Sequence, residues 1–95
     1  MKKWIAHSGG FAKGELHLNE KAVEVLHGDK AVSVLPIGVV RIGGDFEKDE
    51  LVKIMNHDGK SIGVGRVAFD SAEARQMLGK HGQKPLVHYD YLYLE

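Results

Sequence analysis

The stretch PLVHYDYLYLE, residues 85–95, decides how the whole sequence is interpreted. Its histidine, aspartate and tyrosines are side chains typical of a small active site, but the same letters also alternate as a β-strand does. The alternation places on one face Val87, Tyr89, Tyr91 and Tyr93, and on the other Leu86, His88, Asp90, Leu92 and Leu94. Because no nucleophile accompanies His88 and Asp90, we predict a structural role for this pair in a strand that closes the fold.

Working outward from this stretch, the pattern predicts several short strands. Alternating apolar residues indicate strands over 14–18, 51–56 and 61–69, and Asp58-Gly59 is a hairpin signal between the last two. Residues 31–44 are also β-rich but contain Pro36 and Gly38. Since proline cannot donate to a sheet ladder, we predict a kink there with a strand on either side.

Two short helices complete the predicted fold. Asn19 is a suitable N-cap for a helix over 20–26, and Gly28 can end that helix in the left-handed conformation. Asp70 with Glu73 forms a variant of the capping box for a second helix, which Gly79 stops. The fold class predicted is β-rich α+β, a small barrel-like mixed sheet with two short helices.

Length and composition favour a binding or regulatory module. The 95 residues allow one domain, over 1–95, with one modest core. Hydrophobic residues at 43% and charged residues at 27% are ordinary for a soluble globular domain. The sequence lacks cysteine and has no apolar run of about 20 residues, so we expect no disulfide, no membrane span and a cytoplasmic setting.

Charge is balanced overall but unevenly distributed. Thirteen basic and thirteen acidic side chains cancel, which argues against a dedicated non-specific nucleic-acid binder. However, neither segment 1–14 nor segment 74–89 contains an acidic residue. If the two segments meet in space, they form a basic patch. The candidate surface for RNA or another partner comprises Lys13, Lys21, Lys30, Arg75, Lys80 and Lys84.

Motifs that carry catalysis are missing from the sequence. The glycines of GVGRVA lack the third glycine of a phosphate-binding loop, and no serine lies in a nucleophile-elbow pattern. No two of the six histidines have the i, i+4 spacing of helical metal ligands, so we predict no metal site and no catalytic residue.

The order of several segments resembles a known family. KKWI, GELHLNEKAVEVL, VSVLPIGVVRIGGDFEKDELVKI, SIGVGRVAF and VHYDYLYL together resemble a PUA domain, most closely the C-terminal PUA domain of bacterial glutamate 5-kinases. The resemblance implies a mixed-sheet pseudo-barrel with two short helices. It implies structural roles for Trp4, Gly14, Pro36, Gly38, Gly44, Phe46, His88 and Asp90; we also expect Trp4 to pack against the core.

Three positions depart from the family pattern. Lys21 stands where the first helix of the family often has glycine, Asp49 replaces a glycine, and Tyr89 replaces an arginine. In RNA-modifying PUA proteins the helix glycine lets an RNA backbone approach, so the departures argue against RNA binding.

For function, the resemblance implies a non-catalytic accessory or regulatory module of a glutamate 5-kinase of proline biosynthesis. ATP, glutamate and magnesium are then expected in an amino-acid-kinase domain that precedes this one, with no cofactor in residues 1–95. The chain is expected to be an excised domain in which residues 94–95 include tag-derived positions. Two alternatives stay open: an RNA-binding module for structured RNA such as tRNA, and an independent metal-dependent enzyme.

Overall fold

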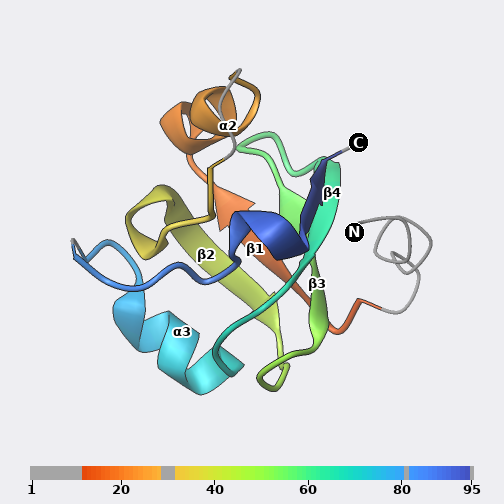
Figure 1. The fold of residues 1–95 in the computed structure, drawn as a ribbon, viewed down its shortest axis with the longest axis vertical. Helices are drawn as coiled ribbons and strands as arrows, with labels where there is room; N and C mark the ends of the chain where they lie inside the picture. Colours follow the sequence, from red (N-terminus) through yellow and green to blue (C-terminus); the bar gives the residue numbers. More distant parts are fainter. Residues whose placement is uncertain (1–11, 29–31, 81, 95) are drawn as a thin grey trace.

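A mixed five-stranded sheet organises the computed structural model, in which residues 12–28, 32–80 and 82–94 are described (Figure 1). The strands follow the order β2-β1-β3-β4-β5 across the sheet. β1 pairs in parallel with β3, and every other neighbouring pair is antiparallel. The strands are β1 (Gly14–Leu18), β2 (Val39–Gly44), β3 (Leu51–Met55), β4 (Ser61–Arg66) and β5 (Leu92–Leu94). The predicted mixed sheet is therefore confirmed.

Two short helices, α2 (Glu20–Leu26) and α3 (Ser71–Met77), lie toward opposite ends of the sheet (Figure 1). Both predicted N-caps are confirmed: Asn19 accepts a hydrogen bond from the N–H of Ala22 at 2.7 Å, and Asp70 accepts one from the N–H of Glu73 at 2.8 Å. Such caps satisfy backbone donors that a helix start leaves unpaired.

The ends of the two helices differ from each other. Gly79 follows α3 with φ 73°, as predicted. Gly28, in contrast, does not adopt a positive φ, so the prediction of a left-handed glycine stop for α2 was wrong. α2 ends instead at Leu26 in a tightened last turn, where the N–H of Gly28 donates to the carbonyl oxygen of Val25 at 3.2 Å.

The continuous closing strand predicted over 85–94 was also wrong. Its middle forms a single 3-10 turn, η3 (Tyr89–Tyr91), and only β5 after it joins the sheet. A second 3-10 turn, η2 (Pro36–Gly38), precedes β2 in the same way, so only one side of the predicted kink is a regular strand. Pro36 begins η2, where the missing N–H of proline breaks no ladder.

An antiparallel bridge between Val34 and Val87 connects the segments that lead into the two 3-10 turns. The N–H of Val34 donates to the carbonyl oxygen of Val87 at 2.9 Å, and the N–H of Leu86 donates to the carbonyl oxygen of Val34 at 2.8 Å. The bridge draws residues 85–94 across one face of the sheet, where Leu86, Val87 and Leu92 enter the core (Figure 1).

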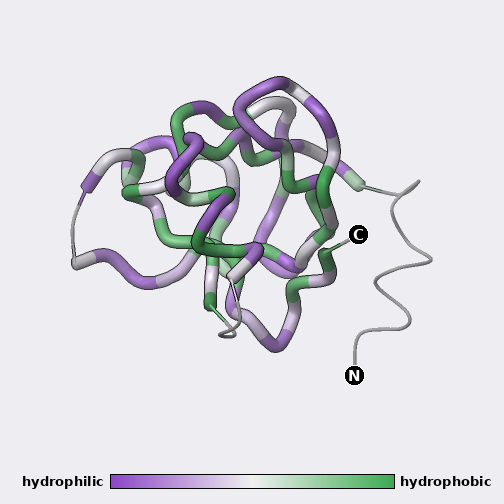
Figure 2. The backbone as a smooth tube through the Cα atoms, turned by 90° about the horizontal axis from the view of Figure 1, so that it is seen from above, coloured by the Kyte–Doolittle hydropathy of each residue, from purple (hydrophilic) through white to green (hydrophobic). Residues whose placement is uncertain are grey.

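The core draws on every part of the described chain. Leu16 and Leu18 of β1 are fully buried, as their alternation predicted, together with residues from β3, α3 and the closing segment. Hydrophobic and hydrophilic stretches interleave along the tube in Figure 2. Within the described residues, no helix is long and apolar enough to cross a membrane.

Several residues that the resemblance marks as structural lie at close contacts. Phe46 is 3% exposed and packs beside Gly14, where an added Cβ atom would come within 2.7 Å of both the Phe46 ring and the carbonyl oxygen of Gly43. Pro36 is fully buried, and Gly44 has φ 74°. Trp4 lies outside the described residues.

Candidate functional site

An apolar groove lies between α2 and η2. It encloses about 280 Å³. Its floor includes the buried residues Leu18, Leu26 and Val34. Its exposed walls are Val25, Leu35 and Ile37, which are 49%, 46% and 38% exposed. Exposed apolar side chains gathered around one hollow are typical of a surface that contacts a partner.

α2 and η2 approach each other closely at Gly38. A Cβ atom on Gly38 would lie 2.7 Å from the Cβ atom of Ala22, so glycine lets the turn approach the helix. The N–H of Asn19 then donates to the carbonyl oxygen of Gly38 at 2.9 Å and ties the helix start to the turn. Sequence reasoning missed the groove, since its walls come from elements separated along the chain.

Those of the proposed RNA or partner cations that the structure describes do not all lie together. Lys21 lies at the groove, whereas Lys13 lies at the other end of β1. Lys80 and Lys84 are exposed in the segment after α3, and Lys30 lies outside the described residues.

Arg75 is occupied within the fold. Its guanidinium donates to the carbonyl oxygen of Gly44 at 2.6 Å and to the carboxylate of Asp45 at 3.3 Å. These contacts join α3 to the end of β2. Arg75 therefore serves the structure, and is poorly placed to bind a phosphate at the same time.

A polar cluster on the outer face of the sheet was not foreseen. His17 is 9% exposed, and its Nε2 lies 2.9 Å from Oε1 of Glu15 and 3.2 Å from Nη2 of Arg41. This nitrogen can donate to the carboxylate or accept from the guanidinium, but not both at once. The alternation in GELHL, which puts His17 opposite the core leucines, was the available signal.

His88 and Asp90 meet at η3. The backbone N–H of Asp90 donates to Nδ1 of His88 at 3.2 Å, so the histidine ring caps the turn. The Asp90 carboxylate lies 3.6 Å from the same nitrogen, and both side chains are largely exposed. Across residues 12–28, 32–80 and 82–94, no group of three or more potential metal ligands comes together.

The chain is similar to several glutamate 5-kinases. It is 59% identical over 95 residues to the glutamate 5-kinase of Bacteroides thetaiotaomicron, covering all of this chain and 26% of that protein. It is 39% identical over 94 residues to the enzyme of Chlorobaculum tepidum, covering 98% and 26%. The chain thus spans about a quarter of the length of these curated relatives.

Solved structures share the fold at low sequence identity. A PUA domain from Aeropyrum pernix K1 matches with a TM-score of 0.70 and 21% identity, covering 80% of this chain and 41% of that one. A chain of the archaeal box H/ACA sRNP Nop10-Cbf5 complex matches with a TM-score of 0.60 and 18% identity, covering 86% and 23%. The family model for the PUA domain matches residues 14–89, so the chain belongs to the PUA domain family.

Proposed function

We propose that this chain is a non-catalytic accessory domain of a glutamate 5-kinase. The observation that carries the proposal is the 59% identity that extends over all 95 residues while spanning only 26% of the related enzyme. In this proposal, glutamate, ATP and magnesium bind in a separate amino-acid-kinase domain of the same polypeptide. The PUA domain contributes to the assembly or regulation of that enzyme in the cytoplasm.

The character of the groove supports a protein contact. Its exposed walls are the apolar side chains of Val25, Leu35 and Ile37, and Lys21 is the one cation among its described lining residues. RNA affinity depends mainly on several cations that neutralise phosphates. The centres of protein interfaces, in contrast, contain few charged residues.

The first test asks whether the isolated chain has catalytic activity of its own. We expect the isolated 95-residue chain neither to phosphorylate glutamate nor to hydrolyse ATP, and the complete polypeptide to phosphorylate glutamate. Coupled assays of both preparations, with equal molar amounts of each, measure this. Turnover by the isolated chain that disappears in the His88→Ala or Asp90→Ala variant would contradict an accessory role.

RNA binding is the second candidate function, favoured by the exposed Lys80 and Lys84 and by the fold shared with a chain of an sRNP complex. We expect only weak, salt-sensitive binding to tRNA, with a Kd no tighter than about 1 μM at about 200 mM salt, as for non-specific contacts. A titration of labelled tRNA measures this.

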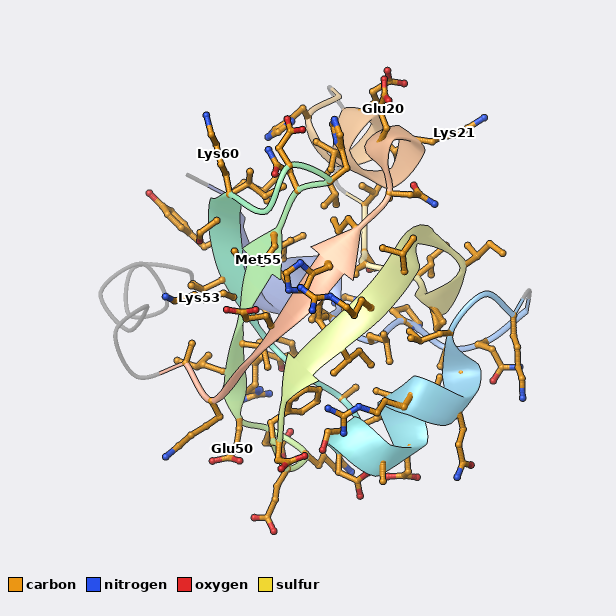
Figure 3. The ribbon with its side chains drawn as sticks, turned by 180° about the vertical axis from the view of Figure 1, so that it is seen from behind. Glu20, Lys21, Glu50, Lys53, Met55 and Lys60 are labelled. Carbon is orange, nitrogen blue, oxygen red and sulfur yellow. The ribbon has the colours of Figure 1, made fainter. Side chains whose placement is uncertain are left out.

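The same titration decides between the two functions. Submicromolar, saturable binding that Lys80→Ala and Lys84→Ala abolish would replace the accessory function with RNA recognition. Lys60→Ala is a suitable control, since Lys60 projects from the turn between β3 and β4 (Figure 3).

A further inference from the structure

Near η3, one arginine side chain of the protein lies between an aromatic ring and a carboxylate of the same chain. The guanidinium carbon of Arg66 lies 3.9 Å from the centroid of the Tyr91 ring, and Nε of Arg66 lies 3.9 Å from Oδ1 of Asp49. A tyrosine face and a carboxylate both attract a guanidinium, and the planar group can stack on the ring while it faces the acid.

The carboxylate in this arrangement sits on strained backbone. Asp49 has φ 73°, the only positive φ among the described non-glycine residues. Such a conformation costs an L-residue about 1 kcal/mol, although aspartate tolerates it better than most. Strain of this kind persists where the surrounding structure requires it, and it is common at surfaces that hold a ligand. The surface that Asp49 and Arg66 share is therefore a candidate binding surface.

An adjacent set of side chains repeats the same chemistry. The ring centroid of His88 lies 4.4 Å from that of Tyr89 and 6.4 Å from that of Tyr91. The carboxylate of Asp90 lies beside His88 and is 67% exposed. Among the described residues, no lysine or arginine lies over the Tyr89 or His88 ring or pairs with Asp90. We name His88, Tyr89 and Asp90 the η3 platform.

The platform is held in place by backbone contacts. The N–H of Tyr89 donates to Oγ of Ser33 at 3.0 Å, and the N–H of Tyr91 donates to the carbonyl oxygen of His88 at 2.9 Å. Nδ1 of His88 accepts the N–H of Asp90 at 3.2 Å, which fixes the ring against the turn. A preordered aromatic surface loses little conformational entropy when it binds.

We propose that the η3 platform binds an arginine side chain of a partner protein, which packs against the His88–Tyr89 ring pair and pairs with Asp90. The intramolecular arrangement of Arg66, Tyr91 and Asp49 shows the same recognition within this fold. The inference is independent of whether the rest of the polypeptide is a kinase.

Charge favours a basic protein partner over a nucleic acid. Asp49 and Asp90 contribute two carboxylates and Arg66 one cation, so these three groups together repel a phosphate group. Arginine suits the site better than lysine because its flat guanidinium stacks and presents a fork of donors. Tyrosine is also among the residues that dominate protein interfaces energetically.

The test is an NMR titration of the ¹⁵N-labelled 95-residue chain with N-acetyl-arginine methylamide. N-acetyl-citrulline methylamide serves as an isosteric neutral probe, and AMP tests for a stacked nucleobase with a phosphate. We expect the arginine probe to shift the signals of residues 88–91 and to saturate with a Kd of about 10 mM or tighter, as suits one anchoring side chain. The citrulline probe should bind at least about fivefold more weakly, as expected when a charged hydrogen bond of about 1 kcal/mol or more is lost.

Two aspartate variants provide a matched comparison. Asp90→Asn should weaken the arginine probe at least about fivefold, while Asp58→Asn should leave its affinity unchanged. Asp58 is a fair control because it is also 67% exposed and also lies near a histidine, at 3.7 Å from His57. Tyr89→Leu, whose fold is checked by its ¹⁵N spectrum, should reduce the affinity as well.

Four results would overturn the proposal. The first is the absence of saturable shifts near η3, and the second is equal affinity for the arginine and citrulline probes. The third is an equal loss of affinity for the arginine probe in the Asp90→Asn and Asp58→Asn variants. The fourth is tighter binding of AMP than of the arginine probe. The last result would identify a nucleobase platform instead.

Discussion

Replacing Gly63 by alanine is expected to lower the free energy of unfolding by about 3 kcal/mol, at the upper end of the range for overpacked sites. An added Cβ atom at Gly63 would overlap the carbonyl oxygen of Tyr93 and come within 3.1 Å of the Leu94 Cα atom. These are backbone atoms of β5, the strand that pairs with β4 at this position. Neither can move aside without separating the two strands.

Thermal unfolding followed by circular dichroism measures the effect, and a loss of this size lowers the Tm of a domain of this length by about 15 °C. Gly43→Ala is the matched control. Its added Cβ atom would meet the flexible end of the Glu15 side chain at 3.0 Å, so we expect a change within about 1 kcal/mol. Similar losses in the two variants would show that the β4–β5 approach does not limit stability.

Replacing Leu86 by alanine is expected to cost about 3 kcal/mol, the middle of the range for truncating a fully buried leucine. Leu86 is 0% exposed and lies next to the bridge between Val34 and Val87, although it belongs to no regular strand. The loss tests whether the segment before η3 is part of the core, as the structure indicates.

Urea unfolding measures the Leu86→Ala loss, with Leu35→Ala as the control. Leu35 flanks the other side of the same bridge but is 46% exposed, so its truncation should cost less than about 1 kcal/mol. If the two substitutions cost the same, the closing segment does not pack as described.

The sequence predicted those parts of the fold that depend on neighbouring residues. Asp70 caps α3 and Gly79 follows its end because both signals act within one or two helical turns. β1 was predicted from the alternation of Leu16 and Leu18, which one buried face of a sheet imposes.

The closing segment could not be predicted in the same way. Its Val-Tyr-Tyr-Tyr alternation favours a strand, but the bridge from Val87 to Val34 and the hydrogen bond from Tyr89 to Ser33 bend the backbone into η3. The partners are 53 and 56 residues away in the sequence, so no local window contains the cause.

The candidate sites likewise depend on contacts between residues that are distant in the sequence. The six proposed cations were chosen by sequence spacing, yet Arg75 is bound within the fold and Lys13 and Lys21 lie at opposite ends of β1. The groove depends on the contact between Gly38 and Ala22, and the η3 platform depends on a turn that the alternation concealed.

The placement of Leu86, Val87 and Leu92 in the core bears on how the protein is made. During translation, β1 through α3 emerge from the ribosome before these three residues do, and the nascent chain meanwhile exposes the apolar face that they will cover. Long-range contacts of this kind form slowly, and uncovered apolar surface favours aggregation. Cooperative folding must therefore wait until β5 has left the ribosome, and the emerged chain exposes this apolar face until then.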